Sequence, residues 1–69
     1  MNDFKISLKA ARVNRNMTQK ELGRKVGRDS ATILNWEKGN SRIPLEDFKK
    51  ICKVLNIPED LVYLPLKSS

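Results

Sequence analysis

The 69-residue sequence contains no histidine and a single cysteine, Cys52. One cysteine cannot form an intramolecular disulfide. Zinc sites draw on several cysteine and histidine ligands, so this composition argues strongly against one. The lack of histidine also removes the commonest general base. We therefore expect no metal, no cofactor and no enzymatic activity, and we expect Cys52 to be a small buried hydrophobe.

Long hydrophobic runs are also missing. No apolar stretch approaches the roughly 20 residues that a membrane-spanning helix needs. The first residues, MNDFKISLKA, lack the apolar segment of a signal peptide. We expect a soluble cytoplasmic protein with no membrane partner. A chain of this length predicts one domain, residues 1–69, with a core at about residues 4–64.

Positive charge is abundant and unevenly distributed. The formal net charge is +6. Residues 1–43 contain ten Lys or Arg and four Asp or Glu, whereas residues 44–69 contain four of each. A polyanion such as nucleic acid is the natural partner of the basic part. The alternative is a solvated basic surface, which many proteins have without binding nucleic acid.

Apolar residues recur at helical spacing, and alternation of apolar with polar residues is scarce. We therefore expect short helices and no strand. Asp3 is the expected cap of a first helix that runs to about Arg15. A last short helix is expected over PEDLVYL, residues 58–64. Asn16 and Asn56 are expected to end the first and fourth helices in the left-handed conformation, which asparagine tolerates well.

Two short helices joined by a tight turn are predicted in the middle of the chain, as in a helix-turn-helix. Thr18 and Glu21 have the spacing of a capping box. Gly27 ends this helix, and Asp29 caps the next one. Gly23 lies inside the first of these two helices, where glycine lowers helix stability by on the order of 1 kcal/mol relative to alanine. We therefore expect another segment to pass close to Gly23.

The apolar positions of the second, third and fourth helices predict the core. Pro44 suits the first turn of the fourth helix. The spacing of Trp36 from Ile33 argues for burial of the indole rather than for stacking on bases. The expected core residues are Leu22, Val26, Ile33, Trp36, Phe48, Ile51 and Leu55.

One stretch resembles the helix-turn-helix of the phage repressor and Cro family, the xenobiotic-response-element class. It reads MTQKELGRKVGRDSATILNWEKG, from Met17 to Gly39, against a family pattern of Leu-Thr-Gln-x-x-Leu-Ala-x-x-x-Gly, a Ser/Thr, a helix and Glu-x-Gly. Gly23 replaces the usual alanine, and Asp29 replaces the usual Ser or Thr cap. The resemblance covers about residues 4–64. It implies an all-α, five-helix, lambda-repressor-like DNA-binding domain with its helix-turn-helix at about residues 18–38.

The resemblance implies that residues 30–38 form a recognition helix in the major groove of double-stranded DNA. The residues implied to read bases are Ser30, Ala31, Thr32, Leu34 and Asn35. Asn35 is the best hydrogen-bonding reader because its amide pairs bidentately with adenine, whereas Leu34 suits a thymine methyl. The residues implied to contact phosphate are Thr18, Gln19, Arg28, Lys38, Asn40 and Arg42, with guanine as the alternative for Arg28. A partly buried Arg12–Glu37 ion pair is also implied.

Four apolar residues near the C-terminus exceed what a short terminal helix needs. They are Val62, Tyr63, Leu64 and Leu66. Either they close the core or they form the two-fold dimer contact that the family suggests. A homodimer would bind a palindromic operator whose half-sites lie about 34 Å apart.

The resemblance therefore implies a small Cro- or repressor-like transcriptional regulator of a prokaryotic cell or phage-infected host, associated with the nucleoid. One alternative is an antitoxin that uses this fold to hold a toxin and represses its own operon. Another is a module of the same fold that binds only protein. RNA binding is less favoured because no exposed stacking aromatics are evident.

Overall fold

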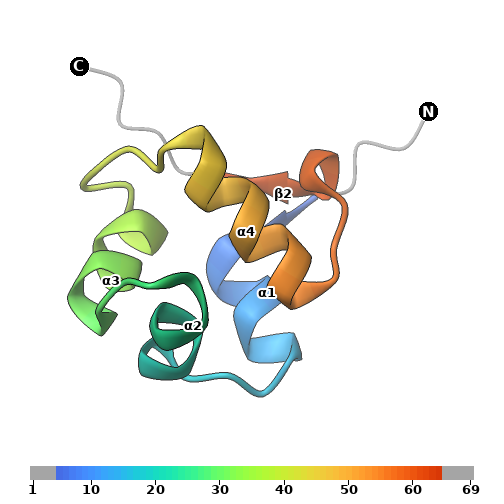
Figure 1. Ribbon diagram of the computed structural model, residues 1–69. Helices are drawn as coiled ribbons and strands as arrows, with labels where there is room; N and C mark the ends of the chain where they lie inside the picture. Colours follow the sequence, from blue (N-terminus) through green and yellow to red (C-terminus); the bar gives the residue numbers. More distant parts are fainter. Residues whose placement is uncertain (1–4, 65–69) are drawn as a thin grey trace.

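The structure is a computed structural model, and it describes residues 5–64. Four α-helices dominate this part: α1 (Leu8–Asn14), α2 (Gln19–Val26), α3 (Ser30–Lys38) and α4 (Leu45–Leu55) (Figure 1). A short strand, β1 (Ile6–Ser7), precedes α1. A 3₁₀ helix (Glu59–Leu61) and a second strand, β2 (Val62–Tyr63), follow α4. The described part is mostly helical, as expected, but the expectation of five α-helices and no strand is wrong.

The first helix begins later than the sequence analysis expected. Asp3, its expected cap, lies outside the described residues. Ser7 is the cap, and its hydroxyl oxygen accepts a hydrogen bond from the amide of Ala10 at 3.1 Å. Serine and aspartate cap helices about equally well, so the choice depends on the surroundings. Ile6 and Ser7 are engaged in a strand, which prevents the helix from extending back through them.

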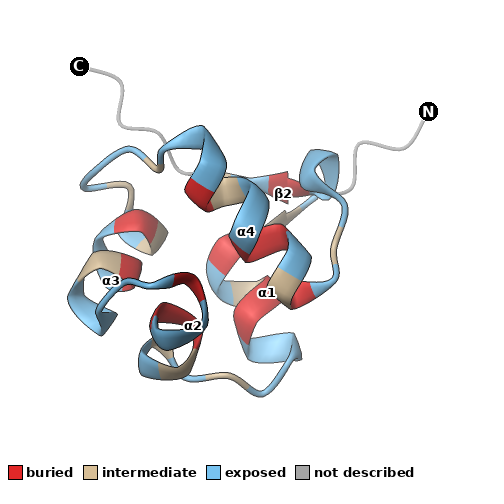
Figure 2. Ribbon diagram, in the orientation of Figure 1, coloured by how far each residue is buried: buried red, intermediate tan, exposed pale blue. Residues whose placement is uncertain are grey.

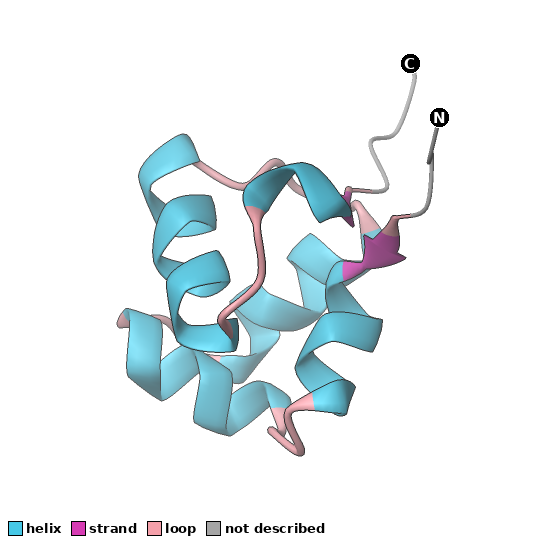
Figure 3. Ribbon diagram, turned by 90° about the vertical axis from the view of Figure 1, so that its right-hand side faces the viewer, coloured by secondary structure: helices cyan, strands magenta, loops and turns pink. Residues whose placement is uncertain are grey.

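The two short strands form a parallel pair. Ile6 lies beside Val62, and Ser7 lies beside Tyr63. The second strand takes residues that were expected in the last helix, of which the 3₁₀ turn Glu59–Leu61 is what remains. Figure 3 shows both strands together at one side of the molecule. The pair therefore ties the beginning of the described chain to its end.

The core lies where the four helices meet, shown in red in Figure 2. Phe48, an expected core residue, is only partly buried, whereas Cys52 is buried as expected. Val62 brings the strand pair into the same core. No described helix is long and apolar enough to cross a membrane. The buried apolar residues are Leu8, Ala11, Leu22, Val26, Ile33, Trp36, Ile51, Cys52, Leu55 and Val62.

Two asparagines end helices in the left-handed conformation, as predicted. Asn16 has φ 57° and Asn56 has φ 54°. Arg15 adds a contact that the sequence analysis missed: its Nε donates to the carbonyl of Leu55 at 2.8 Å. A cation near the last carbonyls of a helix satisfies otherwise unpaired acceptors. This bond therefore joins the end of α1 to the end of α4.

Candidate nucleic-acid interface

The first helix of the helix-turn-helix begins with a complete capping box. The hydroxyl oxygen of Thr18 accepts from the amide of Glu21 at 3.0 Å, and a Glu21 carboxylate oxygen accepts from the amide of Thr18 at 2.8 Å. These hydrogen bonds, from the Thr18 backbone first, hold the pKa of Glu21 below its ordinary value. The start of α2 is therefore defined by local chemistry that the sequence predicts.

The turn between α2 and α3 passes directly over Gly23. A Cβ atom on this glycine would lie 2.5 Å from the carbonyl oxygen of Arg28. The amide of Arg28 in turn donates to the carbonyl of Gly23 at 2.7 Å. Gly27, with φ 77°, supplies the left-handed residue that reverses the chain. The expected close approach at Gly23 is therefore made by the turn itself.

Asp29 caps α3 and sets where it begins. One of its carboxylate oxygens accepts from the amide of Thr32 at 2.8 Å. Hydrogen bonds from Thr32, the side-chain one first, hold the pKa of Asp29 below its ordinary value. A capping carboxylate also meets the positive end of the helix dipole. The cap is therefore formed by an ionised side chain.

The two sides of α3 differ in burial. Ile33 and Trp36 are buried and anchor the helix, with exposed fractions of 0% and 5%. The outward side of α3 is exposed and stands out in pale blue in Figure 2. Leu34 lies on that side, 36% exposed. Of the residues expected to read bases, the structure exposes Ser30, Ala31, Leu34 and Asn35 and leaves Thr32 half-buried.

The C-terminal end of α3 is tied to α1 by the expected ion pair. Arg12 Nε lies 2.6 Å from one carboxylate oxygen of Glu37, and a terminal guanidinium nitrogen donates to the other oxygen at 3.2 Å. Arg12 also donates to the carbonyl of Met17 at 2.8 Å, between α1 and α2. The Arg12 and Glu37 side chains are 9% and 3% exposed. One buried cluster thus joins three segments.

Gln19 takes part in the same cluster, which the sequence analysis did not predict. Its side-chain nitrogen donates to Glu37 at 3.0 Å. Glu37 of α3 thereby orients the side-chain amide of Gln19 at the start of α2. A primary amide carries two donor hydrogens, so one remains for another acceptor.

The N-terminal end of α3 is tied to α4 by a second pair that the sequence analysis missed. Arg28 donates through Nε and one terminal nitrogen to the two carboxylate oxygens of Asp47, both at 3.0 Å. The guanidinium lies over the ring of Trp36, 5.8 Å from the centroid. Hydrogen bonds from Arg28 hold the pKa of Asp47 below its ordinary value. The Arg28 Nη1 nitrogen takes no part in this pair and remains available to other acceptors.

The remaining residues expected to contact phosphate lie near α3. Thr18 is exposed at the start of α2, and Lys38, Asn40 and Arg42 are exposed at the end of α3 and after it. A helix N-terminus and exposed cations both favour an anion. These groups therefore gather near the C-terminal end of α3, because Gln19, next to Thr18, bonds to Glu37 in the last turn of that helix. Arg28 is the expected phosphate-contacting residue that precedes the N-terminal end of α3.

The residues expected at a dimer contact differ in burial. Val62 is 6% exposed and closes the core. Tyr63 is 50% exposed. Leu64 is half-buried and lines an apolar groove, and Leu66 lies outside the described residues. The other residues that line the groove are Arg42, Ile43, Pro44, Leu45 and Phe48.

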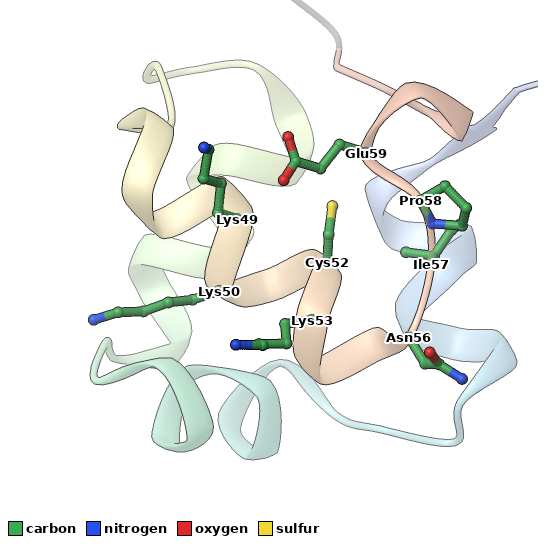
Figure 4. Close-up of a pocket in the computed structure, with 8 residues that line it drawn as sticks. All are labelled: Lys49, Lys50, Cys52, Lys53, Asn56, Ile57, Pro58 and Glu59. Carbon is green, nitrogen blue, oxygen red and sulfur yellow. The ribbon is translucent and has the colours of Figure 1, made fainter.

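A second pocket lies between α4 and the segment that follows it (Figure 4). Lys49 and Lys53 stand on its α4 side, and Glu59 stands opposite. Cys52 points into the space between them. Burial first, and then the nearby Glu59, raises the pKa of this thiol to about 11, so it stays protonated at neutral pH. Within residues 5–64, no group of three His, Cys, Asp or Glu side chains is arranged to hold a metal ion.

Comparison with known proteins agrees with this geometry. A family model described as helix-turn-helix matches residues 8–62, most of the chain. The match includes all four α-helices and ends within the second strand. No curated protein matches the sequence closely enough to count as a relative. The chain belongs to the Cro/C1-type helix-turn-helix family of DNA-binding transcription regulators.

Proposed function

We propose that the protein is a sequence-specific regulator that binds double-stranded DNA with α3 in the major groove. The supporting observation is the division of α3 into two sides. Ile33 and Trp36 hold its inner side in the core, while Ser30, Leu34 and Asn35 remain exposed on the outer side. Both ends of the helix are tied to other helices by arginine–carboxylate pairs. A helix held in this way presents its outer side to base edges with little freedom to move.

Asn35 is the proposed direct reader. Its amide can donate to adenine N7 and accept from adenine N6, and Leu34 beside it suits a thymine methyl. Ser30, Ala31 and Thr32 complete the proposed base-reading set. These side chains favour half-sites that contain A·T pairs. With one strongly hydrogen-bonding side chain in the set, direct readout should be modest.

The phosphate contacts proposed are Thr18, Gln19, Arg28, Lys38, Asn40 and Arg42. Their positions on both sides of the recognition helix support this assignment, because phosphate contacts set the register of a helix in the groove. For Gln19 the second amide hydrogen is the proposed donor. For Arg28 it is Nη1, which lies outside the pair with Asp47.

The substitution Asn35→Ala tests the assignment of the reader. We expect it to cost about 1–3 kcal/mol at one base pair and to relax specificity there. The matched control is Lys38→Ala, at an exposed residue that does not line the apolar groove, which should weaken all duplexes alike and lower the salt slope of log K by about 1. Fluorescence anisotropy on a panel of single-base-pair variants of the preferred duplex measures both. An Asn35→Ala protein that ranks every duplex as the wild type does would refute the assignment.

We further propose that two copies bind a palindromic operator, with the apolar groove as the contact between them. Leu45, at the edge of this groove, is 67% exposed, although it is a large apolar side chain. Residues 44–69 carry no net charge, which suits a surface turned away from DNA. A second copy would cover Leu45 and double the number of base contacts.

The substitution Leu45→Glu tests this contact. We expect weaker cooperative binding to the full palindrome, with binding to an isolated half-site unchanged. Sedimentation of the protein with each duplex measures the stoichiometry. Unchanged dimers would show that the groove does not join two copies. The same groove would then suit a different protein, as the antitoxin alternative requires, and a co-purified second chain would support that alternative.

A further inference from the structure

The side chain of Asn40 contacts the proposed reader, Asn35. The Nδ2 atom of Asn40 donates to Oδ1 of Asn35 at 3.3 Å, and both residues are exposed. Residues five apart in a continuous helix do not face each other. The contact therefore depends on the way in which α3 ends.

Gly39 makes this contact possible. It adopts φ 77°, the left-handed conformation, immediately after α3. The chain reverses there, and the amide of Asn40 donates to the carbonyl of Asn35 at 2.9 Å. This bond from the second residue beyond the helix back into its last turn is typical of a glycine-terminated helix. The backbone bond carries the Asn40 side chain back over Asn35.

The direction of the side-chain bond decides what Asn35 offers to DNA. An exposed asparagine can turn either its oxygen or its nitrogen toward a base, because its amide carries an acceptor and a donor on one carbon. With Oδ1 engaged by Asn40, the Nδ2 of Asn35 is directed away as a donor. The oxygen still has a second lone pair for the N6 amino group of adenine.

We propose that Asn40 is a specificity-determining residue that positions the amide of Asn35 with its donor toward the base. This inference rests on the proposed function, in which Asn35 reads a base. A fixed donor selects base edges that accept hydrogen bonds: N7 of adenine, N7 and O6 of guanine, and O4 of thymine. It discriminates against cytosine, whose major-groove edge offers an amino donor.

Two substitutions of Asn40 test the proposal in opposite directions. Asn40→Ala leaves the Asn35 amide able to rotate. Bidentate contacts make a protein bind the preferred base roughly 5- to 150-fold more tightly than the wrong base. For Asn40→Ala we expect this affinity ratio to fall by at least about threefold at one base pair. Asn40→Asp supplies an acceptor only, which attracts Nδ2 of Asn35 and turns Oδ1 toward the base. The preference should then shift toward bases with an amino donor, so that cytosine gains relative to thymine.

The control for Asn40→Asp is Ser41→Asp, which adds the same charge at the adjacent exposed residue. Both acidic variants should weaken binding to every duplex, but Ser41→Asp should leave the ranking of duplexes unchanged. The readout is therefore the ranking at the Asn35 base pair, measured by competition among four duplexes that differ there. Uniform weakening by Asn40→Ala and Asn40→Asp, with the ranking intact, would overturn the proposal and leave Asn40 as a phosphate contact.

Asn35→Ala separates this inference from the proposed function. If Asn35→Ala changes the ranking at one base pair and the Asn40 variants do not, the positioning role fails and the reader stands. If Asn35→Ala leaves the ranking unchanged, the reader assignment fails, and the positioning role fails with it.

Discussion

The two ends of α3 are each tied to another helix by an arginine and a carboxylate, but in different surroundings. At the C-terminal end, Arg12 and Glu37 are both buried. At the N-terminal end, Asp47 is buried while 45% of the Arg28 side chain is exposed. A buried charge is costly when its partner is lost, whereas an exposed one is solvated and screened by salt. The C-terminal tie should therefore matter for folding, and the N-terminal tie should respond more readily to pH and to DNA.

The largest effect should come from breaking the buried tie with Glu37→Gln. This change leaves the Arg12 guanidinium buried without a counter-charge and removes the carboxylate that orients Gln19. We expect a loss of about 3 kcal/mol in the free energy of unfolding. That is a large fraction of the roughly 3–10 kcal/mol expected for a domain of this size. Urea unfolding followed by the fluorescence of Trp36 measures it, with Glu46→Gln, on an exposed residue, as the control. A loss below about 1 kcal/mol would show that the pair is not held as tightly as its burial indicates.

An intermediate effect is expected from Gly23→Ala, which disturbs the turn at the N-terminal end of α3. Alanine improves helix propensity by about 1 kcal/mol. Its Cβ, however, would meet the Arg28 carbonyl at 2.5 Å, and that backbone atom cannot move alone. We expect a net loss of about 1–2 kcal/mol, because overpacking against backbone outweighs the propensity gain. Lys25→Ala, at an exposed position of the same helix, is the control for urea unfolding. Stabilisation by Gly23→Ala would contradict the close approach.

The smallest effect is expected from Asp47→Asn, which breaks the half-exposed tie. The pKa of Asp47 is lowered by Arg28, so the pair stabilises the fold above the ordinary pKa of 3.8. This stabilisation is lost as the pH falls below that value and the carboxylate is protonated. The free energy of unfolding of the wild type, measured in urea, should therefore fall more between pH 5 and about pH 3 than that of Asp47→Asn. Glu21 and Asp29 also have lowered pKa values, but they are common to both proteins and cancel in the difference. Identical pH profiles for the two proteins would contradict the pairing.

Local chemistry explains what the sequence predicts correctly. Thr18 and Glu21 form the predicted capping box, and Asp29 caps α3, because each cap depends on groups only three residues apart. The left-handed Asn16 and Asn56 follow from the conformational tolerance of asparagine. The expected Arg12–Glu37 contact came from the family resemblance and not from spacing.

Contacts between distant parts of the chain explain what the sequence analysis missed. The strand pair joins Ile6 to Val62, and two residues are too few to show an alternating pattern. The Arg28–Asp47 ion pair joins a turn to a helix, and no local sequence pattern predicts that these two residues are partners. The contact of Asn40 with Asn35 is local, and the glycine at the end of α3 was a signal for it that the sequence analysis did not use.

We propose that the exposed side of α3 reads the sequence of double-stranded DNA. Selection of bound duplexes from a random pool, performed with the wild type and with Asn35→Ala, separates this reading from binding that is independent of sequence. We expect the wild type to enrich a palindrome with A·T pairs in half-sites about 34 Å apart. We expect Asn35→Ala to lose the preference at one position of each half-site. Recovery of duplexes with no enriched sequence would contradict the claim.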